Sequence, residues 1–348
     1  ATGDRYGISG GLAPLKVVVP TFSTKTIQQS TPVSGASNNE MTVTLTANYD
    51  LTTGGTSDAT VTITGLAGSG TATSASLAVT TCASDSLGTT GSWNKDSGTL
   101  ILTVGTTVAA NTACEITFTL TNPTSDLTSP DVSVEAALTD GSSSIGSIAS
   151  AAMVKATGDR YGISGGLAPL KVVVPALAQT GFIEQSTPVA GDTSNVITVT
   201  LTSNYHLKNG TGAAAAKVTI SGLTGTQNSA SPAVTSCSSS ALGTSGTWNQ
   251  TTGTLVLTAT ADINSGVACV ITITVTNPSS DQSSPTVKVS ATLTDGTSAT
   301  SIGTVAQSDL AKATGDRYGI SGGLAPLKVA VPALTQTGFI QQSTPVAG

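Results

Sequence analysis

The stretch Ala1–Pro20 reads ATGDRYGISGGLAPLKVVVP, and it decides the architecture because the chain contains it three times. The same twenty residues recur at 156–175 and again at 313–332, where Ala330 replaces a valine. Self-similarity at a fixed period is typical of a tandem array of one structural unit. We therefore interpret the sequence as a segment of a longer array. The predicted divisions are a first repeat unit at 1–155, a second at 156–312 and the start of a third at 313–348.

Between the motifs, threonine alternates with aliphatic residues. Met41–Thr46 reads MTVTLT, and its counterpart Ile197–Thr202 reads ITVTLT. Such period-two alternation, interrupted by Gly, Asn-Pro and Asp-Gly, predicts short antiparallel strands with one buried face. The pairs Asp140-Gly141 and Asp295-Gly296 predict hairpin turns. We expect an all-β fold made of tandem antiparallel sandwich units.

The composition excludes several classes of protein. Only 9% of the residues are charged and 3% are aromatic, and 13 basic residues face 19 acidic ones. This balance offers no basic patch for nucleic acid, and its charge density is too low for a disordered acidic tail. The apolar runs are far shorter than the roughly 20 residues that a membrane-spanning helix needs.

The four cysteines fall two to a unit: Cys82 with Cys114, and Cys237 with Cys269. Their spacing matches no zinc site, which needs four ligands of this kind. We favour one disulfide in each unit over buried free thiols. Disulfides indicate an oxidising, extracellular or cell-surface setting.

With alternating strands and a Cys–Trp–Cys order in each unit, around Trp93 and Trp248, the chain resembles the tandem immunoglobulin-like sandwich repeats of extracellular proteins. The cysteines lie closer together than those of an antibody-type inter-sheet bridge, and no tyrosine corner precedes Cys114. The strand pairing of the bridge is therefore not carried over. The resemblance implies a role in surface adhesins, surface layers or filamentous appendages.

The repeated motif holds all three arginines of the chain, each between an aspartate and a tyrosine. Arginine offers a planar fork for carboxylate or carbonyl partners and stacks on aromatic rings. The glycines that follow allow a close backbone approach. We expect a shared interface, at the joint between units or between neighbouring chains. The predicted junction residues are Asp4, Arg5, Tyr6, Lys16, Asp159, Arg160, Tyr161, Lys171, Asp316, Arg317, Tyr318 and Lys328.

The end of the motif, bracketed by prolines, is typical of an edge strand. The hypothesis is β-strand addition, in which the segment Lys16–Pro20 leaves its own unit and completes the sheet of a neighbour. Alternatives are a duplication left unmutated by chance, and a ligand-binding loop. A self-formed Lys–Asn crosslink, between residues of the Lys16 and Asn122 types, is a further alternative.

Nothing in the sequence favours catalysis. The single histidine, His206, has Asp50 as its counterpart in the first unit, so it is interpreted as a variable turn residue. Asp126 and Asp281 recur after Asn-Pro and are interpreted as Asx-turn residues. We expect no enzyme activity, no metal and no cofactor.

Glycosylation is expected instead, because Asn209-Gly-Thr and Asn249-Gln-Thr are acceptor sequences. The leading function is that of a structural subunit of an extracellular filament, appendage or surface layer, which has copies of itself as partner. An adhesin stalk that spaces a distal binding domain is the main alternative. Ice binding through the Thr-x-Thr pairs is a weaker one.

Overall fold

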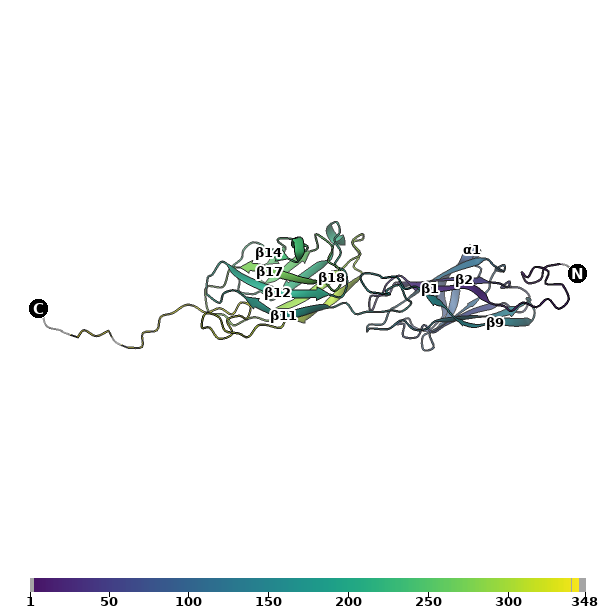
Figure 1. The fold of residues 1–348 in the computed structure, drawn as a ribbon, viewed down its shortest axis with the longest axis horizontal. Coiled ribbons are helices and arrows are strands. Elements are labelled where there is room, and N and C mark those ends of the chain that lie inside the picture. The colour runs from purple at the N-terminus through teal and green to yellow at the C-terminus, as the bar shows by residue number, and fades with distance from the viewer. Residues whose placement is uncertain (1–2, 339, 344–348) are drawn as a thin grey trace.

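A computed structural model of the chain describes residues 3–338 and 340–343. Two β-sandwiches lie end to end along one axis (Figure 1). The second copy of the motif, at 156–175, connects them, and the third copy, at 313–332, follows the second sandwich. We refer to the copies as the first, second and third motif. The all-β expectation is confirmed.

Each sandwich is built from short strands that follow one another along the chain. The strands of the first unit are β1 (Phe22–Gln29), β2 (Asn39–Ala47), β3 (Thr60–Thr64), β4 (Ser74–Thr81), β5 (Thr90–Asn94), β6 (Thr99–Thr103), β7 (Ala113–Leu120), β8 (Ser133–Thr139), β9 (Ser144–Ala152) and β10 (Val154–Lys155). The strands of the second unit are β11 (Leu177–Gln185), β12 (Asn195–Ser203), β13 (Lys217–Ser221), β14 (Ala233–Ser236), β15 (Thr247–Asn249), β16 (Thr254–Thr258), β17 (Ala268–Val275), β18 (Lys288–Leu293) and β19 (Gly303–Asp309). Helical turns are α1 (Cys82–Asp85), η1 (Gly212–Ala214) and η2 (Ser238–Ser240).

In the first unit the strand order is β10-β1-β2-β7-β4-β5-β6-β3-β8-β9, because β4 pairs with both β7 and β5. In the second unit the corresponding layers are separate sheets, β11-β12-β17-β14 and β15-β16-β13-β18-β19. The named strands pair in antiparallel fashion except for β1 with β10, which run parallel. The first unit therefore ends with its last strand beside its first.

The predicted alternation sets the core. In β2 the side chains of Met41, Val43 and Leu45 are buried, whereas the threonines between them lie on the outer face. Trp93 is also buried in this core. The Asp140-Gly141 pair forms the predicted hairpin turn between β8 and β9. Its counterpart at Asp295 lies in the longer connection between β18 and β19.

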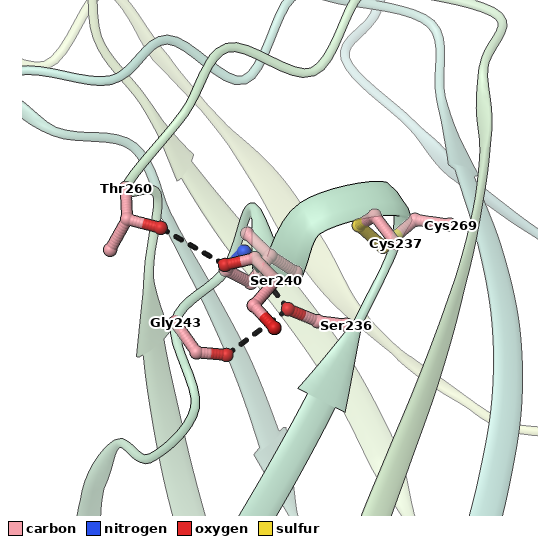
Figure 2. The surroundings of a disulfide bond; sticks show 7 residues. Ser236, Cys237, Ser240, Gly243, Thr260 and Cys269 are labelled. Atoms are coloured by element: carbon pink, nitrogen blue, oxygen red, sulfur yellow. Dashed lines mark hydrogen bonds between the residues drawn. A yellow bond between two sulfur atoms is a disulfide. The ribbon is translucent and has the colours of Figure 1, made fainter.

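A disulfide joins neighbouring strands within each unit. Cys82 follows β4 and bonds to Cys114 of β7, and Cys237 follows β14 and bonds to Cys269 of β17. Figure 2 shows the second bridge beside the turn that Ser236 stabilises through its hydrogen bond to the Gly243 carbonyl. Because β4 pairs with β7 and β14 with β17, both bridges lie within one sheet. This differs from the inter-sheet bridge of antibody domains.

The edge strand expected at the end of the motif does not form. In the second motif Val172 and Val173 make only isolated bridges, to Leu127 and Val33. The prolines that bracket this segment remove backbone donors and restrict φ, so pairing stops after two residues.

Candidate functional site

All three motifs fold into the same loop. In the first, the Asp4 carboxylate accepts the N–H of Gly10 at 2.9 Å, and Arg5 and Ile8 exchange backbone hydrogen bonds. The second and third motifs repeat both contacts. The tyrosine has φ values of 54°, 55° and 51° in the three copies, a region that bulky residues rarely adopt. The loop is therefore a property of the motif itself.

The arginine of each motif lies over the ring of the tyrosine beside it, 4.8, 4.5 and 5.5 Å from the ring centre in chain order. In the first two copies its Nη2 donates to the tyrosine hydroxyl. That bond to Tyr6, with a smaller contribution from Asp140, raises the pKa of Arg5. Asp4 bonds the backbone of its own loop, so the aspartate and the arginine shape the motif separately rather than as an ion pair.

The second half of the second motif docks on the first unit. Leu127 and Val172 exchange two backbone hydrogen bonds of 2.9 Å each. The N–H of Val173 donates to the Pro32 carbonyl at 2.9 Å. Main-chain pairing of this kind is a short form of strand addition, and here it takes place within one chain.

The recurring aspartates also hold the motif. The Asp126 carboxylate accepts the N–H of Val174 at 2.6 Å, and Asp281 accepts that of Val331 at 2.6 Å. The prediction of an Asx turn was wrong, because each carboxylate bonds a residue about 50 positions further along the chain rather than its own turn.

Leu170 and the amide of Gln29 anchor the second motif. Leu170 is fully buried in the core of the first unit. Gln29 is 2% exposed, and its Nε2 donates to the carbonyls of Gly166 at 2.9 Å and Lys171 at 2.7 Å. A buried amide that lacks its partners costs about 1–3 kcal/mol. The motif therefore completes the hydrogen bonding of the unit that precedes it.

A chain of buried amides continues behind Gln29. The Oε1 of Gln29 accepts from Asn39, and Asn39 also donates to Asn122 at 2.7 Å. The Nδ2 of Asn122 donates to the carbonyls of Thr31 and Val33. This network fixes the loop on which the motif docks. It also commits the amide of Asn122, so no contact in the described residues supports the Lys–Asn crosslink.

The third motif docks on the second unit in the same way. Leu327 is fully buried, and Gln282 and Val329 exchange backbone hydrogen bonds of 3.0 and 2.9 Å. Gln185 takes the place of Gln29, and its Nε2 donates to two carbonyls of the motif, at 3.0 and 2.7 Å. One of these carbonyls belongs to Lys328.

The first half of the second motif contacts the unit that follows. The Tyr161 carbonyl accepts the N–H of His206 at 3.0 Å, and the Gly162 carbonyl accepts the hydroxyl of Ser265 at 2.8 Å. Ile163 is 8% exposed and belongs to the core of the second unit. One twenty-residue segment thus places hydrophobic side chains in two successive cores.

The units also contact each other directly. Tyr205 of the second unit is fully buried, and its hydroxyl donates to the Val173 carbonyl at 2.8 Å, with the Pro32 carbonyl 3.1 Å away. Burial raises the pKa of Tyr205. Val33 of the first unit is 2% exposed within the core of the second, where a Cβ added to Gly303 would lie 2.6 Å from Val33 Cγ1. The joint therefore requires glycine at 303.

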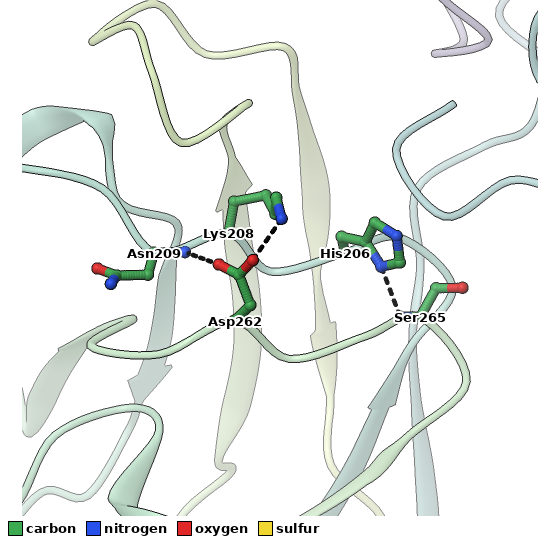
Figure 3. A network of polar contacts seen from close by, with 5 residues as sticks. All are labelled: His206, Lys208, Asn209, Asp262 and Ser265. Atoms are coloured by element: carbon green, nitrogen blue, oxygen red, sulfur yellow. Dashed lines mark hydrogen bonds and ion pairs between the residues drawn. The ribbon is translucent and has the colours of Figure 1, made fainter. Parts of the chain in front are cut away.

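His206 is part of this joint. Its Nδ1 accepts the N–H of Ser265 at 3.0 Å (Figure 3). In the first unit the Asp50 carboxylate accepts the N–H of Ala110 at 2.8 Å, in the corresponding place. Histidine and aspartate share one function here, that of accepting a backbone hydrogen bond next to the motif.

Charged neighbours surround His206. Burial, and then Lys208, lower its pKa, while Asp262 and Asp159 act in the opposite direction. Lys208 forms an ion pair with Asp262, which also accepts the N–H of Asn209 (Figure 3). The hydrogen bond from Lys208 is the main reason that the pKa of Asp262 is lowered.

The amide network was not predicted from the sequence. Its signal there is the tract Gln-Ser-Thr-Pro-Val, which begins at Gln29, Gln185 and Gln342 and so recurs as faithfully as the motif. Lys171 and Lys328, predicted as junction residues, contribute their backbone carbonyls. Tyr318 of the third motif is 71% exposed.

Both predicted glycosylation sites are exposed. Asn209 lies in an exposed loop, and its side chain points away from Asp262 (Figure 3). Asn249 is exposed at the end of β15. Glycans at both positions stay a prediction.

The described residues contain no cluster of three or more histidine, cysteine or acidic side chains able to hold a metal ion. Within the same residues, no helix has the length and hydrophobicity needed to span a bilayer.

No protein-family model and no curated protein sequence matches the chain. Among solved structures, it is similar to the C-terminal domain of the antigen I/II-family protein AspA of Streptococcus pyogenes, with 10% identity and a TM-score of 0.39 over 83% of this chain and 99% of that one. It is also similar to a structure named BspA_C_mut, with 10% identity and a TM-score of 0.38 over 85% and 99%. The serine-rich repeat adhesion glycoprotein Srr1 of Streptococcus agalactiae gives 12% identity and a TM-score of 0.21 over 78% and 91%. At these identities and TM-scores the likeness supports no conclusion about function. The function is inferred instead from the contacts within the chain itself.

Proposed function

We propose that the chain is a structural segment of an extracellular filament, appendage or surface layer, in which sandwich units are coupled end to end by the repeated motif. The observation that carries this proposal is the double attachment of the second motif. Leu170 is buried in the first core and Ile163 in the second. A linker with one attachment would let the units swing, whereas a linker held on both sides opposes bending.

The direct contacts support the same conclusion. Tyr205 and Val33 are buried between the units, and each buried side chain of this size contributes about 1.5–3 kcal/mol. The disulfides and the low charge suit an oxidising extracellular setting. The partner is then another copy of the same unit, and glycans at Asn209 and Asn249 would decorate the exposed surface.

Small-angle X-ray scattering tests the coupling. We expect the native chain to scatter as a stiff rod. Leu170→Asp, which places a charge in the core of the first unit, should give a broader and shorter distance distribution. Leu15→Asp is the matched control, because the equivalent side chain in the first motif is exposed. Identical distributions for all three proteins would refute the coupling.

An adhesin stalk is the second candidate, because the motif docks within one chain and stiffens it without a second copy. Electron microscopy of native surface structures, labelled with an antibody against this chain, separates the two. Filaments with an axial period of one or two units support the filament, and separate strings of beads support the stalk.

A further inference from the structure

In each unit, the segment by which the chain enters runs parallel to the segment by which it leaves. In the first unit these segments are residues 22–34 and 154–174, and in the second they are residues 177–190 and 311–331. All the parallel pairings among the described residues lie between such segments: β1 with β10, Val33 with Val173, Ile183 with Lys312, and Val189 with Ala330. We call this line of contacts the seam of a unit.

Backbone hydrogen bonds hold the seam together. In the first unit the Ala156 N–H donates to the Ile27 carbonyl at 3.0 Å, and the Gln29 N–H donates to the Leu167 carbonyl at 2.9 Å. The second unit repeats both bonds at the corresponding residues, Ala313 with Ile183 and Gln185 with Leu324. The seam is therefore a feature of the repeat rather than of one unit.

Tension along the array would load the seam lengthwise. β1 begins at Phe22, just after the first motif, and the loop that follows it places Val33 in the core of the second unit. β1 therefore runs toward the joint between the two units, which lie end to end (Figure 1). β10 runs parallel to β1 and leads into the second motif at that joint. A pull along the axis draws the start of β1 one way and the end of the leaving segment the other way.

This direction of pull makes the bonds of the seam share the load. Because the hydrogen bonds lie across the strands, two parallel segments pulled at opposite ends separate only by sliding, and several bonds must break together. If the entering and leaving strands were antiparallel, they would be pulled at the same end and would unzip one bond at a time. The parallel direction is the exception in these sheets, and it occurs where the tension would pass.

We propose that the seam is the load-bearing element of each unit. Tension enters through the start of β1 or β11, crosses the hydrogen bonds of the seam and passes through the motif into the next unit. The rest of the sandwich bears no load until the seam has slid. This inference rests on the proposed function, in which the motif couples the units end to end, and it adds resistance to stretching.

The disulfides lie away from the seam and limit how far a broken unit extends. Each bridge closes a loop of 32 positions, which in the first unit includes β5 and β6. That loop stays closed after the seam breaks. Reduction of the bridge should therefore lengthen each unfolding step by roughly 110 Å, the extended length of a 32-position loop.

Single-molecule stretching of the full chain, held by tags at its two ends, tests the seam. We expect two unfolding steps for each molecule, one for each unit. Ala156→Pro removes the donor to Ile27, because proline has no N–H, and it should raise the unfolding rate of one step about fivefold at a fixed force. The other step should keep its native rate. Ala313→Pro should do the same in the second unit, and the double variant should speed both steps.

The matched control is Ile63→Val, in a fully buried side chain of β3 that lies off the seam. Urea unfolding places Ala156→Pro and this control on one scale of stability. Under tension the control should leave both steps unchanged, because its contacts are still intact when the seam slides. Equal acceleration of a step by the two variants, or none by Ala156→Pro, would overturn the proposal.

The native chain gives a second measurement, which decides the matter if Ala156→Pro does not fold. The dependence of the unfolding rate on force reports how far a unit lengthens before it reaches the barrier. Sliding of the seam predicts about 3 Å, the length of one hydrogen bond. Unzipping predicts roughly 10 Å or more, the length of several residues, and that result would contradict a load-bearing seam.

The seam and the coupling of the units fail separately. If stretching contradicts the seam while Leu170→Asp still loosens the two units in scattering, the coupling stands and only the load-bearing element is lost. If Leu170→Asp leaves the scattering unchanged, the coupling fails, whatever the stretching shows.

Discussion

The first and second motifs share twenty residues and differ in their surroundings. Both form the loop closed by the aspartate, and both hold the leucine at positive φ, 58° for Leu15 and 50° for Leu170. One leucine is 98% exposed and the other fully buried. The loop is thus intrinsic to the motif, whereas the docking is supplied by the receiving unit. A preorganised segment loses less conformational entropy when it binds.

The largest difference between the motifs should appear when the leucines are shortened. Leu170→Ala removes a fully buried side chain, and such changes cost about 2–5 kcal/mol. The free energy of unfolding of Leu15→Ala should stay within about 0.5 kcal/mol of that of the native chain, as is usual for surface substitutions. Urea unfolding of both variants checks this, and equal losses would mean that the two motifs do not differ.

The second largest loss of stability is expected for removal of the buried amide of Gln29. Gln29→Ala leaves the carbonyls of Gly166 and Lys171 without a partner and removes one of the two acceptors of the Asn39 Nδ2. Each group that stays unsatisfied costs about 1–3 kcal/mol. Gln28→Ala, at the exposed neighbouring position, is the control. The urea unfolding midpoints of the two variants measure the difference. An unchanged midpoint for Gln29→Ala would show that water replaces the amide.

A smaller loss of stability is expected at Asp126, at the edge of the surface of the first unit on which the second motif docks. Asp126→Ala removes the acceptor of the Val174 N–H, and loss of one such bond costs about 1 kcal/mol. Asp96→Ala, in an exposed turn of the same unit, should be neutral. Hydrogen exchange of the Val174 amide reports the change locally, and unaltered protection there would argue against the role given to Asp126.

The smallest expected effect is a difference in the pH dependence of stability between His206 and its counterpart Asp50. Burial lowers the pKa of His206 in the folded chain, so as pH falls below its ordinary value near 6.5 the unfolded state takes up the proton first. Stability should therefore fall with pH in that window and level off below the folded pKa. Asp262, whose pKa is lowered from 3.8, titrates below it.

Thermal unfolding of the native chain and of His206→Asp, compared at about pH 7.5 and 5, measures the difference. The variant copies the first unit and should lose most of this pH dependence. An unchanged dependence would place its origin at another group.

Much of this arrangement could be predicted from the sequence, because it follows from patterns that recur within one chain. The threonine alternation of β2 gave the sheets, and the cysteine spacing gave one bridge per unit. The surface of the first unit on which the second motif docks could not be predicted in the same way. Leu170 lies 15 residues into the predicted second unit yet is buried in the first. Gln29 is a polar residue whose Nε2 donates to carbonyls more than 130 positions away, and no local periodicity reports such a contact.

Amide hydrogen exchange of the identical tripeptides Val17–Val19 and Val172–Val174, resolved by NMR, tests the central claim most directly. Because both follow Ala-Pro-Leu-Lys and precede proline, their intrinsic exchange rates are closely matched. The amides of the second set donate to Leu127, Pro32 and Asp126, whereas the amides of the first set have no acceptor among the described residues. We predict protection for Val172–Val174 that approaches that of the sheets, and none for Val17–Val19. Equal exchange in the two sets would contradict the account.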